Sequence, residues 1–125
     1  MDIEKTKRYY DRLSDEDIRD CVYCRNYVKE IRSTYQKLAA VLDDWGVDIQ
    51  KPFETIPIGP AEGIMYYAGA QYVIMGPSDD FKDTLIDDVH ISVTNSHPMT
   101  DIDEDHFVIE ISPICLKWNE TKKDT

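Results

Sequence analysis

The chain has 125 residues, of which 42% are hydrophobic and 31% charged, and this composition is typical of one folded soluble domain rather than a disordered chain. It carries 14 Lys and Arg against 25 Asp and Glu, for a net charge of -11, and a surface of this sign repels the phosphates of nucleic acids. No apolar run approaches the ~18 residues of a membrane span, and the first residues lack the apolar region of a secretion signal. We therefore expect a cytoplasmic protein with reduced thiols that binds neither nucleic acid nor membrane.

The first part of the chain is predicted to be helical. Tyr9, Tyr10 and Leu13 indicate a short N-terminal helix, and Ser14 and Asp17 have the spacing of a capping box. From residue 21 onwards an apolar side chain recurs every three or four positions, which places these side chains on one side of a helix. This stripe consists of Cys21, Cys24, Val28, Ile31, Tyr35, Leu38, Leu42 and Trp45.

The stripe predicts a long helix from about residue 15 to residue 45, or two helices with a break near Asp20. Gly46 has the place of a C-cap glycine, and Pro52 prevents continuation of the helix. Because the spacing of the stripe is also that of a heptad repeat, it leaves open a homodimer formed through this helix.

The second part of the chain is predicted to form strands. Extended structure is indicated for residues 53–58, 63–75, 89–94, 107–112 and 114–118. Gly69 predicts a bulge or a close backbone approach, and Pro113 shifts the alternation of the last segment. We therefore predict a single α+β domain over residues 1–118, with the long helix packed on an antiparallel meander of three or four strands. Residues 119–125 are expected to be a disordered tail.

Three segments resemble a group of small bacterial proteins that has no assigned activity. They are the Cys-x-Tyr-Cys-x-Asn-Tyr sequence of residues 21–27, KPFETIP at residues 51–57 and GAQYVIMG at residues 69–76. The resemblance implies a cytosolic bacterial protein and transfers no functional residue to this chain.

The negative charge is concentrated in the second half of the chain. Residues 46–118 hold 3 Lys and Arg against 13 Asp and Glu, whereas residues 1–45 hold 9 against 10. An acidic surface that also exposes tyrosine favours a basic protein partner, so our leading hypothesis is a non-enzymatic protein-binding module. The residues expected at the interface are Tyr66, Asp79, Asp80, Asp87, Asp88, Asp101, Asp103 and Asp105.

The two cysteines of residues 21–24 have three interpretations. As members of the stripe, Cys21 and Cys24 are predicted to be core residues. As metal ligands they would hold zinc, the one cofactor that the sequence suggests, but a structural zinc ion needs two further ligands. Candidates for these are His90, His97, His106 and Cys115. A redox function would be typical of CxxC in thioredoxin-like proteins, but there the motif follows a strand, which this sequence does not predict.

The histidines near the acidic segment suggest a third hypothesis, an enzyme that acts on a small molecule. His97 or His106 would be the acid or base, because nearby carboxylates favour a protonated imidazole. Known nucleophile and phosphate-binding motifs are missing from the sequence. Asp101, Asp103 and Asp105 do not complete a calcium-binding EF-hand loop, since His106 and Ser112 replace its glycine and glutamate.

Overall fold

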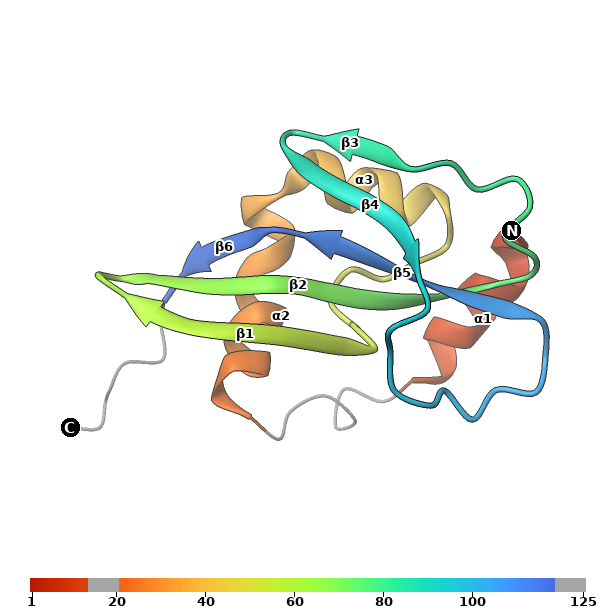
Figure 1. Cartoon of the computed structure of the whole chain (residues 1–125), viewed down its shortest axis with the longest axis horizontal. Helices are drawn as coiled ribbons and strands as arrows, with labels where there is room; N and C mark the ends of the chain where they lie inside the picture. The colour runs from red at the N-terminus through yellow and green to blue at the C-terminus, as the bar shows by residue number, and fades with distance from the viewer. Residues whose placement is uncertain (14–20, 119–125) are drawn as a thin grey trace.

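The computed structural model describes residues 1–13 and 21–118, and in this part of the chain it shows three helices and one antiparallel sheet of six strands (Figure 1). The helices are α1 (Ile3–Arg12), α2 (Val22–Thr34) and α3 (Gln36–Asp44). The strands are β1 (Glu54–Ala61), β2 (Ile64–Met75), β3 (Thr84–Ile86), β4 (Val89–Thr94), β5 (His106–Ser112) and β6 (Ile114–Lys117). The α+β class is confirmed, but the sheet is larger than predicted. The capping box at Ser14 and Asp17 and the predicted tail lie outside the described residues.

The prediction of one long helix is wrong, because the helix is interrupted at Tyr35. This residue has φ -117° and ψ 67°, and its backbone N–H ends α2 by donating to the carbonyl of Ile31. The apolar stripe keeps its spacing across the interruption, so the periodicity alone could not reveal it. At the other end Cys21 is the N-cap of α2, so this helix starts at Val22.

The strands do not form a simple meander. Their order is β1-β2-β5-β4-β3, with β6 also paired with β2, so β5 lies between two strands that precede it in the chain. The short strand β3 was not predicted. It is joined to β4 by a turn in which Asp87 and Asp88 have φ of 48° and 71°. In a sequence, such two-residue hairpin turns are usually recognised by Asn-Gly or Asp-Gly. The Asp-Asp pair is a weaker signal, so the β3–β4 hairpin was missed.

β5 and β6 pair with β2 in one continuous register on both sides of Pro113. Ala70 lies opposite Ile111, and Tyr67 lies opposite Ile114. Both strands change the alternation of their side chains at this level, so the same face of the sheet remains buried. Gly69 makes this possible: a Cβ atom there would lie 3.0 Å from the carbonyl oxygen of Ile111. The predicted close approach of the backbone is therefore confirmed.

The main core lies between the helices and one face of the sheet. Its largest buried side chains are Tyr27, Ile31, Leu38, Leu42, Ile49, Met65, Tyr67, Tyr72, Ile74, Ile91 and Ile109. α1 lies beside the last residues of β2, past the end of β1. There the hydroxyl of Thr6 accepts a hydrogen bond from the Met75 N–H (3.0 Å), and the hydroxyl of Tyr10 donates to the Val73 carbonyl (2.7 Å). The helix thus covers backbone groups that would otherwise form an exposed edge.

The opposite face of the sheet is covered at one end by the segment of residues 95–105. The side-chain amide of Gln71, which is only 2% exposed, donates to the Ser96 carbonyl (2.8 Å) and to Glu110 (3.0 Å). Ile102 packs against a second, smaller core formed by Val73, Met75 and Val108. None of the described helices covers the remainder of this face (Figure 1).

Candidate functional site

The sheet face opposite α2 and α3 exposes apolar side chains between the β1–β2 turn and the β3–β4 turn. We call this surface the open face. It consists of Ile64, Tyr66, Leu85, His90, Cys115 and Lys117, which alternate with core residues along β2, β3, β4 and β6. Tyr66 is 39% exposed and Leu85 58%, whereas the neighbouring Tyr67 is 1% exposed in the core. Tyr66 lies opposite Cys115 in the sheet, so β2 and β6 contribute adjacent side chains to the open face.

The aspartates predicted to surround Tyr66 are divided between two regions. Asp87 and Asp88 form the turn of the β3–β4 hairpin, which also carries Leu85 and His90 of the open face. Asp87 makes a long ion pair with the exposed Lys37 of α3 (3.7 Å). The turn therefore lies at a border between the open face and the helices.

The other predicted aspartates lie at the opposite end of β2. Asp79 and Asp80 follow this strand, and Asp101, Asp103 and Asp105 belong to the segment before β5. The two segments meet there, because the Gly76 N–H donates to the Asp105 carbonyl (2.8 Å).

Three of these aspartates lie near a positive group of the chain itself. Asp80 binds the N-terminal amine at 3.0 Å, and this hydrogen bond lowers the pKa of its carboxyl group. Asp101 and Asp103 line a cavity of about 400 Å³ together with the cationic Arg12 of α1. The sequence-predicted set thus does not form a single surface, and of its aspartates only Asp87 and Asp88 belong to a hairpin that contributes to the open face.

The charge asymmetry of the sequence becomes an asymmetry between layers of the fold. In the part of the chain that the structure describes, the helical region up to residue 45 holds 8 Lys and Arg against 6 Asp and Glu. The region that contains all the strands, residues 46–118, holds 3 against 13. α2 and α3, which carry Arg25, Lys29, Arg32 and Lys37, lie on the face of the sheet opposite the open face (Figure 1).

Cys21 and Cys24 lie at the first turn of α2, not within a long helix. Cys21 is the N-cap, and its Sγ atom accepts a hydrogen bond from the backbone N–H of Cys24 at 3.1 Å. The Sγ atom of Cys24 lies 3.4 Å from the hydroxyl of Thr55 in β1. Both thiols are half-buried, so they are neither fully in the core nor freely exposed.

The two thiols differ in their surroundings. Burial and, to a smaller extent, a hydrogen bond with Cys21 raise the pKa of Cys24 to about 11, although the hydrogen bond with Thr55 opposes this shift. At neutral pH Cys24 is therefore a protonated thiol.

Tyr23, Asn26 and Tyr27 of the same segment make contacts that stabilise the fold. Tyr23 packs against Trp118, and its carbonyl accepts a hydrogen bond from the hydroxyl of Tyr67. Asn26 donates to the Lys117 carbonyl, and Tyr27 is fully buried.

The candidate metal ligands are not assembled. Within residues 1–13 and 21–118, no three side chains of His, Cys, Asp or Glu are grouped as a metal site requires. His106 uses both ring nitrogens, one with the hydroxyl of Thr100 (2.8 Å) and one with the Glu104 carbonyl (2.7 Å). His97 bonds to the neighbouring Pro98 carbonyl and packs edge-on against Phe53. Both histidines thus hold the 95–105 segment in place.

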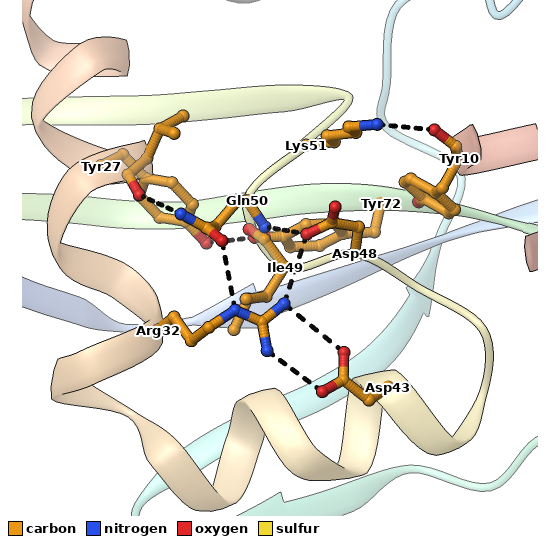
Figure 2. A network of polar contacts seen from close by, with 10 residues as sticks. Tyr10, Tyr27, Arg32, Asp43, Asp48, Ile49, Gln50, Lys51 and Tyr72 are labelled. Atoms are coloured by element: carbon orange, nitrogen blue, oxygen red, sulfur yellow. Dashed lines mark hydrogen bonds and ion pairs between the residues drawn. The ribbon is translucent and has the colours of Figure 1, made fainter. Parts of the chain in front are cut away.

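Figure 2 shows a polar network that the sequence did not predict. Arg32 of α2 binds Asp43 of α3 (3.1 Å), and it also binds Asp48 (3.4 Å) and Gln50 (3.2 Å) of the segment that leads to β1. The salt bridges raise the pKa of Arg32. A cavity of about 250 Å³ beside the network is lined by charges of both signs. Since the guanidinium is already bonded to three side chains, we assign the network to the junction of α2, α3 and β1.

Comparison with known proteins adds no relative: no family model, curated protein or solved structure matches the chain. Among the described helices, none has the length and apolar character needed to cross a membrane.

Proposed function

We propose that the protein binds a basic protein partner through the open face. The observation that carries the proposal is the exposure of Tyr66 and Leu85 on a helix-free sheet face that belongs to the acidic part of the chain. Aromatic and aliphatic side chains supply the apolar centre of protein interfaces, and an acidic surrounding speeds association with a cationic surface.

The turns beside the open face provide the charge complementarity. The β3–β4 turn carries Asp87 and Asp88, the β1–β2 turn carries Glu62, and all three side chains are exposed. Both turns lie in the left half of Figure 1, on either side of β6. Lys117 is the only Lys or Arg among the open-face residues, so a basic partner meets mainly carboxylates.

Site-specific photo-crosslinking tests this proposal. A photoreactive phenylalanine analogue is placed at Tyr66 in one preparation and at Ala40, an exposed position of α3, in a matched control. Each is irradiated in a cell lysate at low salt, and the adducts are identified by mass spectrometry. We expect a basic protein to be captured from position 66 and not from position 40.

Charge reversal then tests the role of the acidic turn. In an Asp87→Lys, Asp88→Lys variant with the analogue at position 66, the yield of the same adduct should fall at least about fivefold, as it should for the parent at high salt. No adduct at position 66, equal adducts at both positions, or capture of an acidic protein or a second copy of this chain would overturn the proposal.

A further inference from the structure

The first turn of α2 presents two thiols with different surroundings, and no part of the proposed binding function uses them. Cys21 and Cys24 are three positions apart, and side chains with this spacing are neighbours on a helix. The Cys21 side chain folds over the first turn, since its Sγ atom lies 3.1 Å from the backbone nitrogen of Cys24. The two thiols thus lie at the same turn of α2, close enough for a hydrogen bond between their side chains.

The Cys21 sulfur lies beside a backbone donor. It accepts a hydrogen bond from the Cys24 N–H at the start of a 13-residue helix, the end of a helix at which anionic groups are generally bound. Cys24 is placed differently: it contacts Thr55 of β1 and is held protonated by burial. Cys21 is therefore placed to attack an oxidant first, and Cys24 to attack the mixed disulfide that this step leaves on Cys21.

We infer that Cys21 and Cys24 form a redox-active dithiol that is oxidised to an intramolecular disulfide by exchange with a small-molecule disulfide. The sequence argued against this function because it predicts no strand before the motif, and thioredoxin-like proteins have one there. The inference rests instead on the N-cap position of Cys21, which places its sulfur beside a backbone donor at the start of α2.

The exchange proceeds in two steps. The thiolate of Cys21 attacks one sulfur of the small-molecule disulfide, whose S–S bond breaks and releases one thiolate, leaving a mixed disulfide on Cys21. Cys24 then loses its proton to solvent and attacks the Sγ atom of Cys21. The mixed disulfide breaks, the second thiolate leaves, and the released thiolates take up protons. The protein has lost two electrons and two protons, and the oxidant has gained them.

The third cysteine, Cys115, is exposed on a strand and would react on its own. The test therefore uses the Cys115→Ser protein, in which Cys21 and Cys24 are the only thiols. The reduced Cys115→Ser protein is incubated with oxidised glutathione at pH 7, quenched with acid and measured by intact mass spectrometry. We expect a product lighter by two hydrogen atoms and without a glutathione adduct. A protein that stays reduced, or that accumulates only adducts, would overturn the inference.

Two single-cysteine proteins test the order of the steps. With Cys115→Ser in the background, Cys24→Ser retains Cys21 and should stop at a glutathione adduct. Cys21→Ser retains Cys24 and should form its adduct at least about tenfold more slowly, because a thiol with a pKa of about 11 is ionised to only about one part in 10,000 at pH 7. Serine is itself a good N-cap, so this variant preserves the start of α2, which circular dichroism verifies. Equal rates, or faster reaction of Cys24, would contradict the assigned roles.

Discussion

The hydroxyl group of Tyr35 binds both backbone groups of Cys115. It accepts a hydrogen bond from the Cys115 N–H at 3.0 Å and donates to the Cys115 carbonyl at 3.3 Å. Cys115 lies in β6, which pairs with β2 on one side only among the described strands. The amide of Asn26 similarly donates to the Lys117 carbonyl at 2.9 Å. Side chains from α2 and from the α2–α3 junction therefore protect an edge that could otherwise pair with another chain.

Removing the Tyr35 hydroxyl should weaken the fold and expose the edge. We expect Tyr35→Phe to lower the free energy of unfolding by about 1–2 kcal/mol, because both backbone groups of Cys115 lose their partner. It should also increase self-association. Urea unfolding and sedimentation velocity measure the two effects. Tyr66→Phe on the open face is the matched control and should change either quantity little; an equal effect of both variants would contradict the prediction.

The buried Tyr27 and Tyr72 should respond unequally to loss of their hydroxyl groups. The Tyr72 hydroxyl donates to the Ile49 carbonyl at 2.7 Å and also bonds to the Tyr27 hydroxyl. Tyr72→Phe leaves two buried polar groups without this partner and should cost about 2–4 kcal/mol, whereas Tyr27→Phe leaves the bond to Ile49 intact and should cost about 1 kcal/mol. Urea unfolding of both variants checks the order, and a greater loss for Tyr27→Phe would show that it is wrong.

Stability should fall at alkaline pH. Burial raises the pKa of Cys24 from 9.0 to about 11, and it raises the pKa of Tyr10, Tyr27 and Tyr72 above 10.0. Each folded-state pKa exceeds its unfolded value, so above pH 9 the folded protein binds more protons and the free energy of unfolding decreases as pH rises. Urea unfolding at a series of pH values measures this slope.

The Cys24→Ser variant separates the thiol from the tyrosines in this titration. Between pH 9 and 10 its free energy of unfolding should decrease less steeply with pH than that of the parent. Above pH 10 the decrease caused by the tyrosines should remain. An unchanged slope between pH 9 and 10 would mean that the Cys24 thiol is not linked to folding.

Gly69→Ala should destabilise the sheet although Gly69 does not have a positive φ. The new Cβ atom would lie 3.0 Å from the Ile111 carbonyl oxygen and 3.3 Å from the Cγ of Glu110. Because the nearest atom belongs to the backbone of the paired strand, relief requires movement of β5, at a cost of about 1–3 kcal/mol. Thermal unfolding measures the loss, and Ala68→Gly at the neighbouring exposed position is the control. Equal losses in the two variants would show that backbone crowding is not the cause.

Part of the candidate site could be predicted from the sequence. The alternation of side chains indicated that either Tyr66 or Tyr67 would be exposed, but only the packing of the helices decided which face β2 turns to the core. The carboxylates of Asp79 and Asp101 were grouped with that tyrosine because they share its half of the chain, and the strand order then placed them at the other end of β2. Gln71, which binds the 95–105 segment through the Ser96 carbonyl, had no sequence signal, since a buried amide resembles a surface residue in a strand pattern.

The sequence by itself determined the α+β class, the helical and extended halves, the apolar stripe and the position of the negative charge. These properties depend on the chemistry and spacing of neighbouring residues, which local periodicity records. The tertiary structure decided the interruption at Tyr35, the insertion of β5 between β2 and β4, and the start of α2 after Cys21. The first two depend on contacts between distant segments: the hydroxyl of Tyr35 reaches β6, and β5 pairs with β2 more than 30 residues earlier in the chain. Cys21 became an N-cap because its backbone is extended there, a conformation that the apolar spacing does not encode.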